Sequence, residues 1–326
     1  MKLRPLAIFA ILILTQVQSF AVEDCASVDV RDSLPADVKT FMTTPSDQGD
    51  IGWCFGWAAT DLLSQAVGAP VSALHTSNYF SSRVSALGKF GRKFMGYQKV
   101  PEGGDIASAL KEMKSLGYVC HEKDIPSQGT HKIALNGTAY TYGGMNRLFE
   151  RLKAYRENTC NDICQVALNS LIEAFVPASS NTEDLKRYVK KYPKVPLEDV
   201  LHYFLNLSCL YDKITLNDFS YGTATNRLNL SRLTDSIDKV LNQNRLIGLE
   251  YDASQITAVG GIFGGGHAST IVARKKIANQ CYYLVRNSWG TSCDYRPGVI
   301  CEKEQGSYWV KKDVMEKMAT KIVWIK

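Results

Sequence analysis

Cys54 stands at the start of a predicted helix, a position from which a thiol can act as a nucleophile. The small and apolar residues after it recur with helical spacing and form one stripe: Phe55, Ala58, Ala59, Leu62, Leu63, Ala66 and Val67. Gly68 and Pro70 predict the end of this helix. Free backbone N–H groups and the positive end of the helix dipole stabilise a thiolate in the first turn. By itself, however, the pattern fits an inert buried thiol or half of a disulfide better.

Three further residues share an order with Cys54. Gln48 lies six residues before it, His267 follows a Gly-Gly-Ile-Phe run at 260–263, and Asn287 begins an Asn-Ser-Trp-Gly run. This order resembles the papain-like cysteine peptidases, which place a Gln before a helix-opening Cys, then a distant His-Ala and an Asn-Ser-Trp-Gly after a strand. One such piece matches easily by chance, whereas four pieces in order favour the family.

The resemblance implies a Cys-His-Asn site that hydrolyses peptide bonds through an acyl-thioester. His267 would take the proton of Cys54, giving a thiolate–imidazolium pair, and return it to the leaving amine. Asn287 would accept the Nδ1–H of His267 and fix the ring, while Trp289 would cover that hydrogen bond. The side-chain amide of Gln48 and the Cys54 N–H would form the oxyanion hole.

Gly103 and Gly104 precede a predicted helix and match the substrate-binding Gly-Gly of the family. Glycines let the backbone of an extended peptide approach closely and pair as an added strand. The alternative is a simple turn before a helix. The family usually bridges two cysteines here, but this chain has Ile51 at the first position and residues 101–102, Pro-Glu, around the second, so both partners are absent together.

The sequence departs from the family next to the nucleophile. Phe55 replaces the usual Trp, and Trp53 stands where a small residue is usual. A bulky Trp53 beside the thiol is expected to narrow the cleft or crowd a substrate residue. Gly266 precedes the histidine where an Asp is common, which predicts a shifted pH range for the ion pair.

The fold class that the resemblance implies is α+β, with two lobes and the active site in the cleft between them. The helical lobe contains the Cys54 helix, and the second lobe is β-rich and barrel-like. Strands are expected at 246–251, 268–273, 282–286 and 306–310. The resemblance covers about 34–126 and 227–312, and the helical pattern between predicts an insertion at about 127–226 within a peptidase domain at 22–326. The insertion is either structural packing or a lid over the cleft.

Residues 1–21 have the pattern of a secretory signal peptide: Lys2 and Arg4, an apolar run, and small residues before Ala21. The run is shorter than the ~20 residues that span a bilayer, so no membrane span is expected after its removal. We therefore expect a secreted or periplasmic protein. Only twelve residues separate this segment from the start of the resemblance, so the inhibitory propeptide of the family is expected to be absent.

Nine cysteines in an exported chain predict up to four disulfides and one free thiol. Cys293 and Cys301 flank a predicted loop and are candidates to pair. Cys160 and Cys164 have poor metal-ligand spacing, and neither a metal nor a cofactor is expected. The net charge of +6 is modest, and the basic clusters are interpreted as solvated faces, which excludes nucleic acid as the expected partner. The expected partner is a peptide or protein substrate, and the oligomeric state is left open.

Two other functions remain open. A catalytically weak papain-like module could bind peptides or a partner protein and would need no reactive Cys54. Transamidation or cleavage of cell-wall peptides uses similar residues, although the spacing of Gln48 and the Asn-Ser-Trp-Gly run fit peptidases better. Individually, His267 also fits a core histidine, Asn287 a turn, and Gln48 a loop cap.

Overall fold

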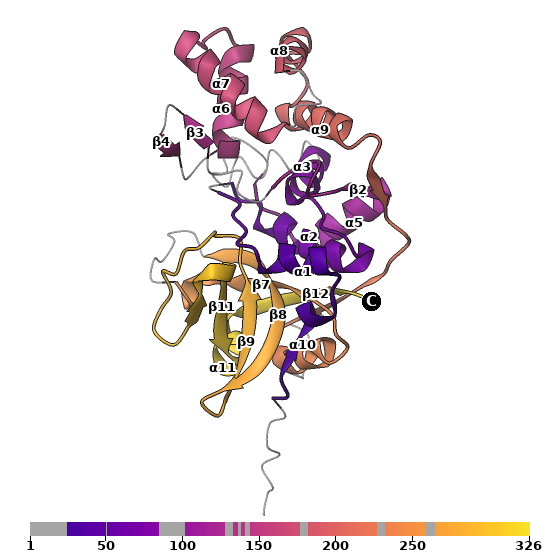
Figure 1. Cartoon of the computed structure of the whole chain (residues 1–326), viewed down its shortest axis with the longest axis vertical. Helices are drawn as coiled ribbons and strands as arrows, with labels where there is room; N and C mark the ends of the chain where they lie inside the picture. Colours follow the sequence, from indigo (N-terminus) through magenta and orange to yellow (C-terminus); the bar gives the residue numbers. More distant parts are fainter. Residues whose placement is uncertain are drawn as a thin grey trace, which may run out of the picture.

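The computed structural model describes residues 25–49, 51–84, 102–127, 133–135, 138–140, 144–176, 182–226, 232–257 and 265–326. They form an α+β fold in which most of the helices gather at one end and an antiparallel sheet lies at the other (Figure 1), so the predicted fold class is confirmed. The predicted signal peptide and the Gly-Gly-Ile-Phe run lie outside the described residues. Within the described part, no helix is both long and apolar enough to cross a bilayer.

The helices nearest the sheet surround the predicted nucleophile helix. Their bounds are α1 (Ala36–Thr43), α2 (Cys54–Val67), α3 (Ala73–Arg83) and α5 (Ile106–Leu116). Helix α2 is buried from Phe55 to Ser64, and it ends at Gly68, whose φ of 68° is left-handed, as the sequence predicted. Gly56 allows α2 to approach α3 closely, because a Cβ there would lie 2.0 Å from Oγ of Ser77.

The sheet is antiparallel and follows the order β10-β11-β9-β8-β7-β12-β6, with β1 paired to β8. Its strands are β1 (Val28–Asp29), β6 (Tyr221–Thr225), β7 (Ile247–Asp252), β8 (Gly266–Ile277), β9 (Gln280–Arg286), β10 (Ile300–Glu302), β11 (Ser307–Lys311) and β12 (Ala319–Ile325). The predicted strands correspond to β7, β8, β9 and β11. Helices α10 (Leu233–Leu241) and α11 (Lys312–Met318) pack against the sheet, and short 3-10 helices lie at Val30–Ser33, Ala253–Gln255 and Lys303–Gln305.

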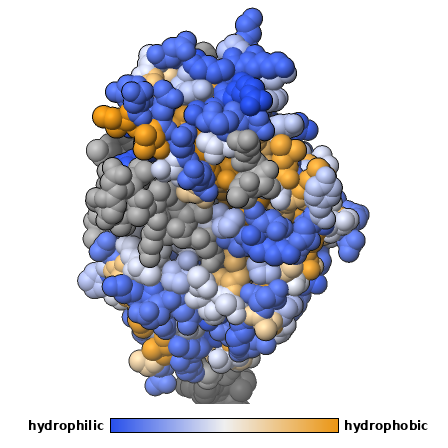
Figure 2. Space-filling model, turned by 45° about the horizontal axis from the view of Figure 1, so that its top comes forward, coloured by the Kyte–Doolittle hydropathy of each residue, from blue (hydrophilic) through white to orange (hydrophobic). Residues whose placement is uncertain are grey.

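The remaining helices lie on the side of α3 that faces away from the sheet (Figure 1). They are α6 (Gly144–Arg156), α7 (Asp162–Phe175), α8 (Thr182–Lys191) and α9 (Leu197–Ser208), with the strand pairs β3 (Ile133–Leu135) with β4 (Thr138–Tyr140) and β2 (Tyr118–Cys120) with β5 (Lys213–Thr215) nearby. Their exposed apolar side chains include Ile163 and Val166 on α7. On the face drawn in Figure 2, hydrophilic residues predominate and apolar residues form separate patches.

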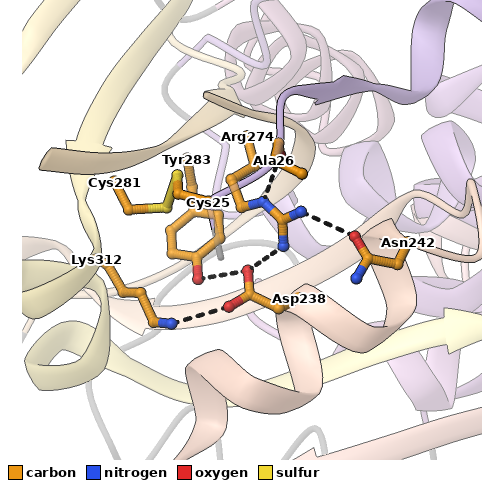
Figure 3. Close-up of a disulfide and its surroundings, with 8 residues drawn as sticks. All are labelled: Cys25, Ala26, Asp238, Asn242, Arg274, Cys281, Tyr283 and Lys312. Atoms are coloured by element: carbon orange, nitrogen blue, oxygen red, sulfur yellow. Dashed lines mark hydrogen bonds and ion pairs between the residues drawn. A yellow bond between two sulfur atoms is a disulfide. The ribbon is translucent and has the colours of Figure 1, made fainter. Parts of the chain in front are cut away.

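Four disulfides pair every cysteine except Cys54, as the odd count predicted. The pairs are Cys25–Cys281, Cys120–Cys209, Cys160–Cys164 and Cys293–Cys301. The first joins the N-terminal segment to β9 beside a buried polar cluster (Figure 3). There Arg274 donates to the carbonyl of Ala26 at 3.0 Å and to Asp238 at 2.7 Å. The N-terminal segment is therefore held to the sheet by a covalent bond and a hydrogen bond.

A buried ion pair joins the sheet to α2. Nη1 of Arg286, at the end of β9, lies 2.9 and 3.0 Å from the two carboxylate oxygens of Asp61 on α2. The other two guanidinium nitrogens donate to the carbonyls of Met42, Phe41 and Thr44 at the end of α1. All three nitrogens of Arg286 are therefore satisfied inside the protein, and the pair fixes the position of the sheet relative to α1 and α2.

Candidate active site

Cys54 is the first residue of α2, and its thiol faces the first strand residues after His267. The side chain is partly buried and forms no disulfide. The backbone amides of Ala268, on β8, and of Phe55 interact with Sγ and favour its charged form. The structure therefore brings together the predicted nucleophile and the strand that carries the predicted base.

His267 lies near the start of β8 and is 8% exposed. Its Nε2 lies 2.8 Å from Oδ1 of Asn287, the residue that follows β9. The ring of Trp289 lies over the imidazole, with centroids 4.3 Å apart and planes 31° from parallel. The structure thus brings His267, Asn287 and Trp289 together, although they are separated in the sequence.

The hydrogen bond of His267 uses the other nitrogen than the sequence analysis expected. The backbone N–H of Ser288 donates to Oδ1 of Asn287 at 2.8 Å, which identifies that atom as the oxygen. An oxygen of this kind can only accept, so Nε2 carries the hydrogen of this bond. The expected Nδ1–H bond is therefore wrong, and Nδ1 is the nitrogen that can accept a proton.

A chain of buried hydroxyls behind Asn287 was missed by the sequence analysis. Ser269 donates to Oδ1 of Asn287 at 3.1 Å, and its Oγ lies 3.1 Å from the hydroxyl of Tyr251. Tyr308 in turn donates to Tyr251 at 2.9 Å. Ser269 lies two residues after His267 and therefore on the same face of β8, which was the available signal. Tyr251 lies opposite His267 only through the register of β7 with β8.

Four of the predicted site residues line one cleft of about 520 Å³: Cys54, His267, Gly103 and Gly104. Gly103 has a φ of 73°, and its N–H donates to the carbonyl of Gly52 at 2.8 Å. This hydrogen bond joins the segment before Cys54 to the segment that contains Gly103 and Gly104. A Cβ on Gly104 would lie 2.7 Å from the ring of Phe80, so this position requires glycine.

Gln48 is held beside the Asn-Ser-Trp segment. Its Oε1 accepts from the Ser288 hydroxyl at 2.6 Å, and its Nε2 donates to the carbonyl of Ile51 at 2.8 Å. One Nε2 hydrogen is used by the Ile51 carbonyl, which leaves the second for another acceptor. Gln48 lines a neighbouring hollow with Trp53 and Trp57, and Trp289 lines a third hollow with Tyr295.

Trp53 does not narrow the cleft, contrary to the expectation from the sequence. Its side chain is fully buried and meets the ring of Phe149 on α6 edge to face, with centroids 6.3 Å apart. Phe55 likewise packs edge to face on Phe80 at 4.7 Å. The side chains of Trp53 and Phe55 therefore point into the core. Of these three consecutive residues, only Cys54 lines the cleft.

Burial sets the charge state of the substrate-free site. It raises the pKa of the Cys54 thiol to about 11, with the negative charge of Glu250 adding to the shift and the nearby backbone amides opposing it. Burial also lowers the pKa of His267 to about 4, although the hydrogen bond with Asn287 acts in the opposite direction. Burial therefore favours the neutral forms of the thiol and the imidazole, whereas the sequence analysis expected an ion pair.

One group of potential metal ligands occurs among the described residues: His75, Cys120 and Cys209. The two sulfurs are bonded to each other and offer no thiolate. The same neighbourhood contains Asn206, whose side chain accepts from the Tyr118 hydroxyl at 2.8 Å.

No protein-family model and no curated protein sequence matches the chain. Among solved structures, it is similar to SERA5E of Plasmodium falciparum, with a TM-score of 0.48, 11% identity, and 93% of this chain and 97% of that one covered. It is also similar to digestive procathepsin L 3 of Tenebrio molitor, with a TM-score of 0.46, 13% identity, and coverages of 92% and 69%. A third, from a study of the mite allergens Blo t 1 and Der p 1, has a TM-score of 0.46, 12% identity, and coverages of 95% and 73%. These neighbours are papain-like proteins, and the likeness concerns the arrangement of the chain alone.

Proposed function

We propose that this chain is a papain-like cysteine peptidase that hydrolyses peptide bonds through Cys54, His267 and Asn287. The observation that carries the proposal is the hydrogen bond from Nε2 of His267 to Asn287, because it leaves Nδ1 as a proton acceptor in the cleft that holds a free thiol. Trp289 covers the imidazole and shields this bond from water.

The mechanism follows from these positions. A peptide would lie as an extended strand along Gly103 and Gly104. As the sulfur of Cys54 attacks the carbonyl carbon, Nδ1 of His267 takes the thiol proton. The oxyanion would be held by the Cys54 N–H and by the second Nε2 hydrogen of Gln48. The imidazolium then gives its proton to the leaving amine, and water hydrolyses the thioester with the same histidine as base.

Because burial favours the neutral forms of Cys54 and His267, we propose that proton transfer accompanies substrate binding. A bound peptide replaces water around the thiol and supplies the carbonyl that the sulfur attacks. This departs from a preformed ion pair, and it makes the reactivity of Cys54 in the absence of peptide a poor measure of catalysis.

The test is digestion of a peptide mixture by the wild-type chain and by the Cys54→Ala, Cys54→Ser and His267→Gln variants, with products identified by mass spectrometry. Loss of the nucleophile or base is expected to lower kcat/KM by at least about 10⁴-fold. A matched control is Cys25→Ala with Cys281→Ala, which removes two sulfurs outside the cleft and should leave the cleavage pattern unchanged. Equal cleavage by wild type and Cys54→Ala would contradict the proposal.

The second candidate is a peptide-binding module without catalysis. The raised pKa of Cys54 and the lowered pKa of His267 favour it, since both shifts favour the neutral form of the group. No cleavage of any peptide by the wild-type chain, together with binding of the same peptides, would support this candidate.

Export and domain organisation also belong to this proposal. We propose that residues 1–21 are a signal peptide, so that the mature chain is secreted or periplasmic; the disulfides are consistent with an extracellular setting. We also propose that 127–226 is an insertion with a structural role. The contact between Phe149 on α6 and Trp53, one residue before the nucleophile, supports this role.

A further inference from the structure

Two carboxylates occupy one wall of the cleft. Glu250 and Asp252 are alternate residues of β7 and line the cleft together with Cys54. On the same face of the strand, Gly248 lies against Ile106 and Leu62 of the helical lobe, so the face emerges from the lobe interface into the cleft. Among the described residues that line the cleft, none is lysine or arginine.

Glu250 is close to the nucleophile. It pairs across the strands with Ala268, whose backbone amide meets the sulfur of Cys54. Residues directly opposite in an antiparallel pair have Cβ atoms about 5 Å apart. The carboxylate therefore acts electrostatically on the reacting region, and its charge adds to the rise in the pKa of Cys54.

One carboxylate oxygen of Glu250 bonds to other parts of the protein, and the other oxygen does not, within the part of the chain that the structure describes. Oε1 accepts from the N–H of Ile106 at 3.0 Å and lies 3.3 Å from Nζ of Lys321. Among the described residues, no hydrogen bond or ion pair engages Oε2. The structural role of Glu250 thus leaves half of its carboxylate for a ligand.

The nearby cation does not neutralise the wall. Lys321 is shared between Glu250 and Asp105, which it contacts at 3.0 Å, so one negative charge remains in that group. Asp252 accepts from the N–H of Ser254 at 3.0 Å, and its interactions with Ser254 hold the pKa of its carboxyl below the ordinary range. Asp252 is therefore ionised at neutral pH.

We infer that the cleft selects peptides with a lysine or arginine side chain beside the reacting bond, bound by Glu250 with Asp252 adding to the negative potential. This inference rests on the proposed function for the position of the bond that is cleaved. The preference for a cationic side chain is itself a property of peptide binding. A cationic side chain next to the Cys54 and Gly104 region can donate to Oε2, which a norleucine or glutamate side chain of similar size cannot do.

The experiment uses peptide sets that differ by lysine, norleucine or glutamate at one position. The wild-type chain is compared with Glu250→Gln, which keeps an oxygen for the Ile106 N–H and removes the charge. Glu304→Gln, exposed and outside the cleft, is the matched control for net charge. In parallel, Cys54→Ala and the double variant Cys54→Ala/Glu250→Gln are titrated with the same peptides by calorimetry, so that binding is measured without cleavage.

We expect lysine to be preferred over norleucine by about tenfold or more at one position, the scale of a hydrogen bond to a charged group. Glu250→Gln should remove most of this preference, and Glu304→Gln should keep it. Cleavage or binding without charge preference would overturn the inference and leave the proposed function intact. Binding with the preference but no cleavage would support the inference and overturn the proposed function, whereas neither cleavage nor binding would overturn both.

Discussion

Two ion pairs lie near the boundary between the sheet and the helical lobe, and they differ in how many of their hydrogen-bonding atoms the protein itself satisfies. Arg286 and Asp61 have side chains 2% and 3% exposed, and each guanidinium nitrogen has an acceptor inside the protein. Lys321 and Glu250 are 23% and 21% exposed, and Glu250 lines the cleft. A charge whose hydrogen-bonding atoms are all satisfied internally fixes geometry, whereas a charge at the edge of a cleft keeps the capacity to bind a ligand.

The buried pair is placed where geometry matters most for the proposed chemistry. Arg286 directly precedes Asn287, and Asp61 is on the helix that begins at Cys54. The pair therefore connects the segment that begins at Asn287 with the helix that begins at Cys54.

The largest expected effect comes from breaking the buried pair. Arg286→Met leaves Asp61 charged and unpaired in the core, so it should lower the free energy of unfolding by about 3–5 kcal/mol. Adding Asp61→Leu should recover a large part, because it removes the stranded charge. Guanidinium denaturation measures both, with Lys39→Met in the exposed Lys39–Asp32 pair as control. A loss no greater than that of the control would refute the distinction between enclosed and exposed charges.

Buried histidines extend the comparison to groups that the core holds without charge. His75 on α3 and His202 on α9 lie side by side, with ring centroids 6.0 Å apart. Burial lowers the pKa of His75 to about 3 and that of His202 to about 4; the charge of the other histidine also acts on His75, and Arg83 and Lys213 on His202. Both folded values lie below the ordinary ~6.5, so this contribution to stability is complete above that pH and is lost as the pH falls toward 4.

The expected loss is about 1.4 kcal/mol per pH unit for each histidine in that window. The glutamine of His75→Gln can still hydrogen-bond Asn206, and the variant should lose the contribution of one histidine to the slope of unfolding free energy against pH. The control is His121→Gln, which changes a partly exposed histidine. Urea unfolding at a series of pH values gives the slopes. A His75→Gln slope equal to that of the wild type would show that the histidine is not held neutral by its burial.

The smallest effect on stability is expected at the cleft wall. Lys321→Met removes a partly exposed cation and should change the free energy of unfolding by less than about 1 kcal/mol. It should nevertheless increase the preference for lysine-containing peptides, because Glu250 then has no competing cation. The sign is opposite to that of Glu250→Gln, and kcat/KM ratios for lysine and norleucine peptides measure it. A decreased preference in Lys321→Met would remove the distinction between the two pairs.

The sequence alone determined the features that depend on neighbours along the chain. The stripe after Cys54 and the stop at Gly68 predicted α2, and the resemblance predicted the strands β7, β8, β9 and β11. The odd number of cysteines predicted one free thiol, and the order of Gln48, Cys54, His267 and Asn287 selected the residues to examine. Each of these signals depends on neighbouring residues, on a residue count or on the order of residues along the chain. The predictions therefore needed no knowledge of how the chain packs.

Only the tertiary structure decided how these residues meet. The nitrogen of His267 that bonds Asn287, the hydroxyls of Ser269 and Tyr251 behind it, and the burial of Trp53 against Phe149 all depend on strand register or on contacts between distant segments. The same holds for Glu250, which reads as an ordinary strand residue in the sequence. Register places it opposite Ala268 and beside the nucleophile, because two strands far apart in the chain align through hydrogen bonds that no local pattern encodes.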